Sequence, residues 1–594
     1  MRPVICSASA PVLCFARATL RITVAVGGAV FWGWDGAGPL PSEALSGAPP
    51  RPDARAVLEP DTGGGWRVVS ERVTVAVSQL GAVEIRTPGG VLLRRDLPPC
   101  WWEPVGGGGG RWLQSTELPA DARVFGLPGP GPRAGAPAPV TAPLLLVVAD
   151  AASHFVFHDT ARDGTLSVRD GEEGAGSGHD RPGRCELRMA GGPLRCWVAV
   201  GTPTRVLRTW TALRGAQPLP PDWAFGHHHV RYDDDRGEES PRRAVERHRE
   251  LRLPLDAVHM AGERGGEGGE LAGLTPDGSQ LPRIAVELAE AGVWLVSSEA
   301  AGGQSGQQGL PGGVLAQHGP PLPQTSEVAP VGDWAGLREA LGRVLGLGLS
   351  GVPYAGVELE LGRLEGELLL RALQLGIHLP LLRTGGEWTG RAAEAARPLL
   401  AERQRLLPYR TTLARTARRG GVPMVRPVWW QTPADRRLRA HEDTFLLGDA
   451  LLVAPVLAAG VRELEVRLPR GRWYDTASGR LYRGPRTVRL AAPPERIPVL
   501  VRAGAVLPVR EEDGSVGLEV WAPPEGRTGS GVYVPQQGAD RAAAERYTAR
   551  RGPGGLVAVE REGTGGPVPA ARPVRIHGDQ APRDGTPEGS GPQM

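Results

Sequence analysis

Hydrophobic and polar positions alternate through roughly the first 218 residues with the period of two that β-strands require. Thr19 to Val26, Trp66 to Val77 and Val83 to Arg86 follow this alternation, and Leu144 to Val148 is a short apolar run typical of a buried strand. Gly- and Pro-rich stretches separate these segments. The pattern predicts an antiparallel N-terminal β-sandwich over residues 1–218.

From Trp223 onward the pattern changes to alternating strands and helices. The expected strands are Trp223 to Val230, Leu255 to Met260, Val293 to Ser297, Val352 to Glu358 and Ile377 to Arg383. The expected helices are 240–251, 281–291, 334–345, 365–375 and 391–418. Repeated strand–helix units with right-handed crossovers predict a (β/α) barrel over residues 219–420.

This barrel is expected to be short. About six strands fit into some 200 residues, whereas a complete barrel has eight strands in about 250 residues. The stretch from Ala300 to Pro330 consists mostly of Gly, Gln, Pro and Ser, and nothing in it resembles a core strand. The pattern therefore predicts a shortened barrel and leaves its closure open.

Beyond Gly421 the pattern returns to β structure. Thr444 to Val456, Glu463 to Leu468 and a hairpin from Trp473 to Tyr482 predict a second β-sandwich over residues 421–509. A smaller β domain over 510–577 and a disordered tail over 578–594 are expected to follow. The predicted fold class is therefore multidomain, with α/β and all-β parts.

Composition excludes some classes of function. The chain has no Lys, so all 68 basic residues are Arg, and the net charge is only +3. With abundant Gly, Pro and Ala, this Arg bias is typical of a genome that avoids AT-rich codons. It gives no reason to expect nucleic acid or an acidic membrane as a partner. The chain also has no Asn, so it can have no N-glycosylation site and no complete catalytic motif that needs Asn.

The cysteines and the apolar runs limit the possible classes of protein further. The five cysteines have no C-x-x-C spacing, which predicts neither a disulfide framework nor a zinc ribbon, and no cofactor is expected. No apolar run approaches the ~18–20 residues of a membrane span. Val4 to Ala16 is only weakly similar to a secretory signal, because Pro11 interrupts it. We expect a cytoplasmic location, with secretion as the alternative.

Seven sequence strings carry a resemblance to a known family. They are Pro220 to Gly226, Leu347 to Tyr354, Arg405 to Tyr409, Met424 to Pro427, Phe445 to Val456, Gly471 to Asp475 and Ile497 to Gly504. By these strings the chain resembles glycoside hydrolase family 31, the α-glucosidase and α-xylosidase family, over roughly residues 15 to 550. The resemblance implies a galactose-mutarotase-like N-terminal sandwich, a (β/α)8-type TIM barrel and C-terminal β-sandwiches.

The resemblance also implies a retaining mechanism that uses two carboxyl groups about 5–5.5 Å apart. The family's nucleophile motif, W-x-D-M-N-E, has no match here. The region expected to hold it contains only Glu299 and Glu327 as acids. Asp333 is the remnant of the acid/base motif W-x-G-D-N, but Pro330 and Trp334 replace its Trp and Asn. Asp333 could equally be the N-cap of the helix that follows it.

The family's sugar-binding positions are also altered. By resemblance, Glu263 and Glu358 take the places of two substrate-binding acids, Ala261 replaces another, and Arg383 is retained where the adjacent His is lost. His228, on the first predicted barrel strand, and Arg231, directly after that strand, complete the candidate substrate-binding set. Glu263, Glu358 and Arg383 could instead form surface or structural ion pairs. The tryptophans Trp101, Trp102, Trp429 and Trp430 could stack on sugar rings or simply pack in a core.

A metal-dependent hydrolase is a competing hypothesis. His227 and His229 would share one face of a strand and could ligate a metal, with His259 or His378 as further ligands. The alternative is that the three consecutive histidines line a polar barrel mouth.

Two functions lead. One is an α-glucosidase-like scaffold that binds saccharide or a protein partner, with hydrolysis lost or strongly impaired. The other is an active α-glycoside hydrolase whose site is rebuilt from Asp333 with Glu263 or Glu358.

Overall fold

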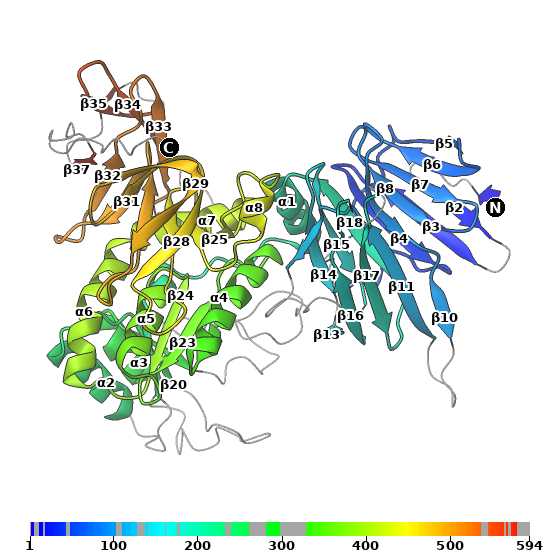
Figure 1. Cartoon of the computed structure of the whole chain (residues 1–594). Coiled ribbons are helices and arrows are strands. Elements are labelled where there is room, and N and C mark those ends of the chain that lie inside the picture. The colour runs from blue at the N-terminus through cyan, green and yellow to red at the C-terminus, as the bar shows by residue number, and fades with distance from the viewer. Residues whose placement is uncertain are drawn as a thin grey trace, which may run out of the picture.

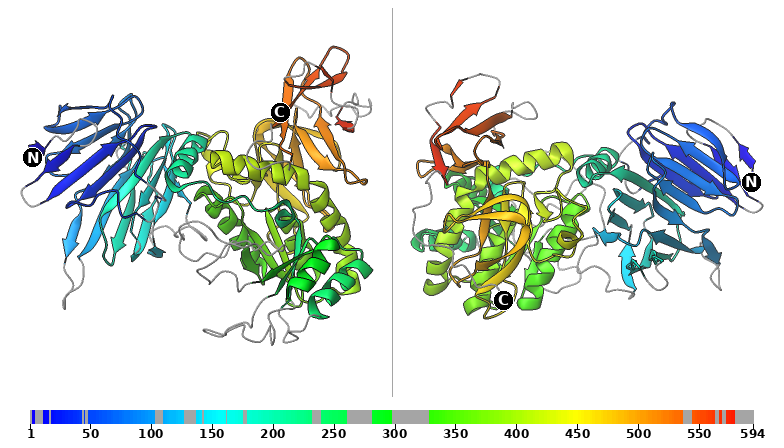
Figure 2. Two further views of the ribbon diagram at one scale, coloured as in Figure 1. Left: turned by 180° about the vertical axis from the view of Figure 1, so that it is seen from behind. Right: turned by 45° about the horizontal axis from the view of Figure 1, so that its top comes forward.

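The protein has two lobes, one formed by the N-terminal sheets and the other by a parallel sheet together with the C-terminal sheets (Figures 1 and 2). The computed structural model describes residues 2–4, 11–15, 18–42, 45, 48–102, 110–126, 137–141, 143–160, 162–174, 179–231, 239–260, 281–297, 328–535, 544–562, 566–567 and 572–578. Helices α1 and α8 lie at the junction of the two lobes (Figure 1).

The N-terminal lobe is the predicted antiparallel sandwich of two sheets. One sheet has the order β1-β2-β3-β4-β18-β15-β14-β12. The other has the order β13-β16-β17-β11-β9-β8-β7-β6-β5, with β10 paired to β11. The strands are β1 (Arg2–Val4), β2 (Val12–Cys14), β3 (Thr19–Val24), β4 (Ala29–Trp34), β5 (Val57–Asp61), β6 (Gly65–Val69), β7 (Thr74–Ser78), β8 (Val83–Arg86), β9 (Leu92–Asp96), β10 (Cys100–Trp102), β11 (Arg111–Leu118), β12 (Arg123–Phe125), β13 (Ala138–Thr141), β14 (Leu144–Val148), β15 (Ser153–His158), β16 (Asp163–Arg169), β17 (Gly183–Met189) and β18 (Arg195–Gly201).

A helix that the sequence pattern did not predict follows this sandwich. Helix α1 (Pro203–Arg214) starts with Thr202 as N-cap and Pro203 in its first turn, which is a favoured arrangement. Its Trp210 ring lies 5.4 Å from Phe155 and 5.0 Å from Phe157, between ring centroids. The helix therefore buries an apolar face against the first sheet.

The predicted barrel region contains a six-stranded parallel sheet in the order β21-β20-β19-β24-β23-β22. Its strands are β19 (His227–Arg231), β20 (Ala257–Met260), β21 (Trp294–Ser297), β22 (Val328–Val331), β23 (Gly356–Glu360) and β24 (Leu381–Gly385). The helices of this region are η1 (Asp222–Phe225), α2 (Glu239–Glu250), α3 (Leu281–Glu290), α4 (Trp334–Leu349), α5 (Gly366–Gly376), α6 (Gly390–Arg405) and α7 (Leu407–Gly420). Within the described ranges this sheet is open between β21 and β22.

Three local expectations in this region were wrong. Strand β22 includes Val328 to Pro330, part of the stretch expected to hold no strand; its Pro is tolerated because β22 is an edge of the described sheet. The long helix predicted over 391–418 is two helices separated at Leu406, because Pro408 starts a new helix better than it continues one. The strand expected from Trp223 begins only at His227, after the short helix η1.

The C-terminal part is β-rich, as predicted. Its sheets have the orders β25-β26-β27-β30-β28-β29, β31-β32-β37 and β33-β34-β35-β36. The elements are β25 (Val425–Pro427), α8 (Arg436–Arg439), β26 (Phe445–Leu447), β27 (Leu451–Val453), β28 (Glu463–Asp475), β29 (Leu481–Ala491), β30 (Val499–Arg502), β31 (Val506–Arg510), β32 (Val516–Trp521), β33 (Thr528–Tyr533), β34 (Glu545–Arg551), β35 (Val557–Arg561), β36 (Gly566–Pro567) and β37 (Val574–His577). The predicted tail 578–594 lies, apart from Gly578, outside the described residues.

Two hydrophobic cores join these parts. One extends from the parallel sheet, through Leu359 and Leu382, to Val501 and Trp521 of the C-terminal sheets. The other joins the N-terminal sandwich and α1 to the C-terminal sheet around Trp429. The domain boundaries at 218, 420 and 509 remain predictions.

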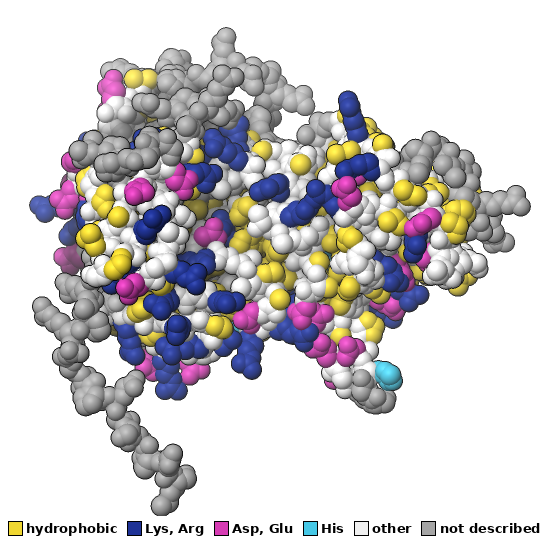
Figure 3. Space-filling view, turned by 90° about the horizontal axis from the view of Figure 1, so that it is seen from above, with side chains coloured by type: hydrophobic (Ala, Val, Ile, Leu, Met, Phe, Trp, Pro, Cys, Tyr) yellow, Lys and Arg dark blue, Asp and Glu magenta, His cyan; other side chains and the backbone are white. Residues whose placement is uncertain are grey.

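Charge is mixed over the surface. Seen from above, arginine side chains are scattered among acidic and apolar ones (Figure 3). Among the described helices, none has the length and apolarity that a membrane crossing requires.

Candidate functional site

One face of the parallel sheet brings together three of the predicted substrate-binding residues. Arg383 on β24 is paired in register with Glu358 on β23 and with His228 on β19. Residues paired in a parallel sheet point to the same side, so these three side chains project from one face. The sheet therefore places an acid, a guanidinium and an imidazole in one row.

Aromatic rings extend this row. Trp294 on β21 stacks on Trp223 of η1, with ring centroids 5.5 Å apart and planes 16° apart, and Trp223 lies 5.7 Å from the His228 ring. Trp294 belongs to the His228 face because it is paired with Ala257, which is in turn paired with His228. Both tryptophans are only partly buried. Stacked, partly exposed indoles beside charged groups fit a ligand that has both an apolar face and hydroxyl groups.

His228 and His259 are joined by a hydrogen bond. His259 Nε2 lies 3.0 Å from His228 Nδ1, and His228 Nε2 lies 3.2 Å from the Trp223 carbonyl oxygen. Burial, followed by the charge of Arg383, lowers the pKa of His259 to about 3. Burial, His259 and Arg383 also lower the pKa of His228 well below its usual value. Both rings are thus neutral at physiological pH, and one donates to the other.

Glu358 differs from an ordinary surface acid. It is half-buried, and burial raises its pKa; the charge of Arg383 opposes this rise and Glu360 adds to it. Glu360 lies on the same face two residues further on, where its carboxylate binds Arg363 at 3.0 Å. Neither Glu360 nor Trp294 was among the predicted site residues. The alternation along β23 could have identified Glu360 from the sequence.

Asp333 lies just past the carboxyl end of β22, where parallel (β/α) sheets place functional residues. It is exposed and is the N-cap of α4, since its Oδ1 accepts a hydrogen bond from the Gly336 N–H at 2.7 Å. The capping role suggested by the sequence is therefore confirmed.

Other predicted residues fall outside this geometry. Glu263, Ala261, Glu299 and Glu327 lie outside the described residues, and Arg231 ends β19 without a described side chain.

The predicted H-x-H pair lies on the opposite face of β19. His227 Nδ1 lies 2.7 Å from the Pro254 carbonyl, and its Nε2 lies 2.8 Å from Thr384 Oγ1. The His229 ring centroid lies 4.8 Å from that of His248 on α2. His227 and His229 therefore pack on the helix side of the sheet, and only His228 points to the other face. In the described part of the chain, no three His, Cys, Asp or Glu side chains are grouped so that they could hold a metal ion.

The four tryptophans considered for sugar stacking divide into two pairs. Trp429 and Trp430 are buried in the core between the lobes, so they pack and do not bind. Trp101 and Trp102 on β10 are each 41% exposed, and Trp101 contacts Trp34 edge-on at 5.8 Å.

Comparison with known proteins identifies the family of one C-terminal segment. Residues 421–507 match the glycosyl hydrolase family 31 C-terminal domain. A segment of 122 residues is 38% identical to a probable glucan 1,3-alpha-glucosidase of Arabidopsis thaliana, and 117 residues are 41% identical to neutral alpha-glucosidase AB of Mus musculus. Residues 421–507 therefore form a C-terminal domain of the glycoside hydrolase family 31 type.

The matched segments are short. They cover 20% and 19% of this chain but only 13% and 12% of the plant and mouse relatives. Sequence identity to these enzymes is thus concentrated in about a fifth of the chain.

Solved structures extend the likeness in fold to nearly the whole chain. A GH31 dextranase of Flavobacterium johnsoniae, in complex with isomaltotriose, has a TM-score of 0.78 over 98% of this chain and 92% of its own, at 16% identity. The glucosidase II alpha subunit has a TM-score of 0.75 over 93% and 86%, at 14% identity. At such identities these similarities establish the fold alone.

Proposed function

We propose that this chain is an α-glucosidase-like protein of glycoside hydrolase family 31 that binds a saccharide on the sheet face that bears His228, with hydrolysis lost or strongly impaired. The observation that carries the proposal is the register pairing of Glu358 with Arg383 on the face that also bears the Trp223–Trp294 stack. A carboxylate and a guanidinium can hydrogen-bond sugar hydroxyls, while indole rings cover the apolar face of a sugar ring.

The loss of hydrolysis is supported by the partners of the acids at the carboxyl ends of β22 and β23. Asp333 accepts from the Gly336 backbone, Glu358 lies in the field of Arg383, and Glu360 binds Arg363. A retaining glycosidase needs two facing carboxyl groups about 5–5.5 Å apart. Because the chain has no Asn, it cannot contain the family's intact nucleophile motif.

The same proposal includes the barrel. We infer that the six parallel strands belong to a shortened (β/α) barrel that closes between β21 and β22, because α2, α3, α4 and α5 each connect two neighbouring parallel strands as in barrels. A scan of paired cysteines along β21 and β22 tests this, since a disulfide forms only where Cα atoms come within about 7 Å. Absence of cross-linking at every pair would exclude closure.

Saccharide binding is tested by calorimetry with isomaltose and maltose on the full chain. We expect measurable binding, weakened about tenfold by Glu358→Gln or Arg383→Gln, since each removes a hydrogen bond to a charged group. Glu339→Gln, at an exposed position of α4, is the matched control and is expected to bind as the unchanged protein does. Equal affinities in all four proteins would refute this site.

A second candidate function is an active hydrolase that pairs Asp333 with Glu263 or Glu358. The raised pKa of Glu358 favours it, because a carboxyl that keeps its proton can act as a general acid. Release of p-nitrophenol from α-glucoside or α-xyloside substrates, abolished by Asp333→Ala, would establish this alternative.

A further inference from the structure

A groove with a volume of about 800 Å³ lies between the turn that joins β3 to β4 and helix α1, far along the chain from the sugar-site residues. This volume is within the range of small-molecule sites. Val26, Ala29 and Leu213 supply apolar lining, and Arg72, Arg205 and Arg208 supply charge.

Two of these arginines pack closely against glycines. A Cβ on Gly28 would stand 2.8 Å from Arg72 Cδ, and one on Gly201 would stand 2.7 Å from Arg205 Cδ. The aliphatic stems of Arg72 and Arg205 therefore lie directly against bare backbone. A side chain at either glycine would displace the arginine stem that packs there.

The positive charge in this groove is only partly balanced by the described acids, since the hydrogen bonds from Arg55, and to a smaller extent the charge of Arg72, lower the pKa of Asp53. Arg205 and Arg208 are one turn apart on α1, where like charges repel, and both are exposed. Asp53 and Glu71, near Arg72 in the fold and the chain, bind Arg55 at 3.1 Å and 2.9 Å. The described residues that line the groove include no acid. A bound anion would relieve this repulsion.

We propose that the groove binds a small organic anion, a phosphate monoester with an apolar substituent. Arginine matches phosphate oxygens with two parallel hydrogen bonds, and the Thr204 hydroxyl in the lining can donate another. Val26 is 61% exposed, and together with Leu213 it offers the substituent an apolar surface. The site is independent of the saccharide site.

Calorimetry with phenyl phosphate on the full chain tests the proposal. We expect one phenyl phosphate per chain, weaker binding of methyl phosphate because it lacks the apolar group, and no binding of phenol. Arg205→Gln and Arg208→Gln are each expected to weaken phenyl phosphate binding about tenfold.

Arg249→Gln, at an exposed position of α2, is the control and is expected to change nothing. The thermal midpoint of each variant shows that it is folded. The proposal fails if phenyl phosphate gives no binding heat at millimolar concentration, or if the Arg249 variant weakens binding as much as the groove variants do.

Discussion

Arg403→Met is expected to destabilise the parallel-sheet region by about 3–5 kcal/mol, because it leaves a set of buried carbonyl groups without donors. The Arg403 side chain is fully buried on α6. Its guanidinium donates to five backbone carbonyl oxygens, namely those of Gly226 at 2.8 Å, Gly376 at 2.9 Å, Ile377 at 3.3 Å, Leu379 at 2.8 Å and Pro380 at 2.7 Å.

These contacts tie together the segments that precede strands β19 and β24. Gly226 comes directly before β19, and Gly376 to Pro380 connect α5 to β24. Removing the guanidinium would therefore loosen the two strands that carry His228 and Arg383. Arg403→Lys is expected to be nearly as harmful, since an ammonium group has fewer donors and no planar fork.

Thermal unfolding of the full chain measures this effect. We expect the midpoint to fall by about 6–20 °C for Arg403→Met. Arg391→Ala, at an exposed position of the same helix, should stay within about 0.5 kcal/mol of the unchanged protein. If both variants unfold at the same temperature, Arg403 does not stabilise this region.

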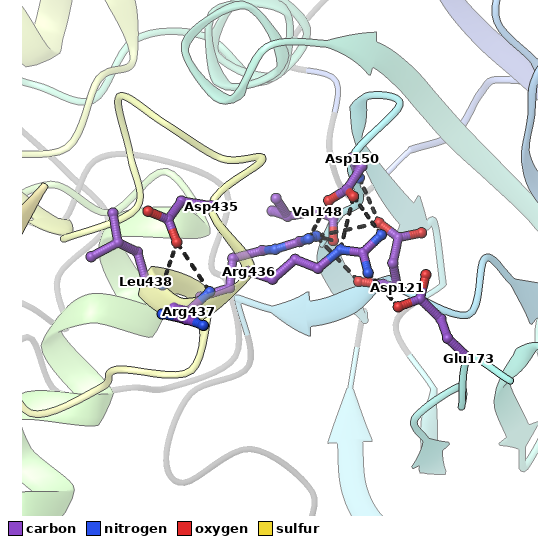
Figure 4. Close-up of polar contacts among 9 residues, drawn as sticks. Asp121, Val148, Asp150, Glu173, Asp435, Arg436, Arg437 and Leu438 are labelled. Atoms are coloured by element: carbon purple, nitrogen blue, oxygen red, sulfur yellow. Dashed lines mark hydrogen bonds and ion pairs between the residues drawn. The ribbon is translucent and has the colours of Figure 1, made fainter. Parts of the chain in front are cut away.

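Arg439→Ala is expected to loosen the contact between the two lobes, at a cost of about 3 kcal/mol. Arg439 lies on α8 of the C-terminal part, and its side chain is 1% exposed. It donates to the Val148 carbonyl at 2.9 Å and to the Asp121 carbonyl at 3.2 Å, and it binds the carboxylate of Asp150. Figure 4 labels these three partners, which all lie in the N-terminal lobe.

A second arginine of α8 reinforces this contact. Arg436 binds Asp150 at 2.6 Å and also pairs with Glu173 (Figure 4). Asp435, the N-cap of α8, accepts hydrogen bonds from the Arg437 and Leu438 N–H groups at 3.1 Å and 3.2 Å, which fixes the direction of the helix.

The contact should also weaken in acid. Burial tends to raise the pKa of Asp150, but its hydrogen bond from Arg436 and the charges of Arg439 and Arg436 lower that pKa overall. A carboxyl whose pKa is lower in the folded state stabilises that state above its unfolded pKa, and this stabilisation is lost as the pH falls through the folded pKa. We therefore expect the lobes to separate more easily below about pH 4.

Small-angle scattering and limited proteolysis check this prediction. Arg439→Ala should increase the radius of gyration and expose the junction to protease at neutral pH. Arg437→Ala is the control, because Arg437 is an exposed neighbour on the same helix. If the scattering curves of both variants coincide with the curve of the unchanged protein, Arg439 does not hold the lobes together.

The sequence predicted the β-rich parts well where hydrophobic alternation and turn residues agree. The hairpin expected from Trp473 to Tyr482 is present, with these two residues paired across β28 and β29. Leu144 to Val148 and Val83 to Arg86 are strands with the predicted bounds.

The predicted element bounds were wrong where no Gly or Pro marks the end of a strand, or where Pro starts a helix. Trp66 to Val77 was expected to be continuous, but a turn at Ser70 to Val73 divides it; the Ser70 hydroxyl accepts from the Val73 N–H at 3.2 Å in place of a turn glycine. Helix α1 was missed because its start, Thr202 and Pro203, follows directly on a strand.

The candidate site was only partly predictable. The resemblance selected Glu358, Arg383 and His228, and the sheet register brings these three together. It did not select Trp294, because pairing between strands far apart in the chain is not visible in local patterns. The spacing of His227 and His229 predicts that they share a face. It does not predict that this face packs toward α2.

If this scaffold recognises sugar without cleaving it, glucose release from isomaltose and maltose during long incubation is the most direct measurement. The full chain and its Asp333→Ala variant are both expected to release no more glucose than buffer does. Glucose release by the full chain that disappears in Asp333→Ala would contradict this expectation.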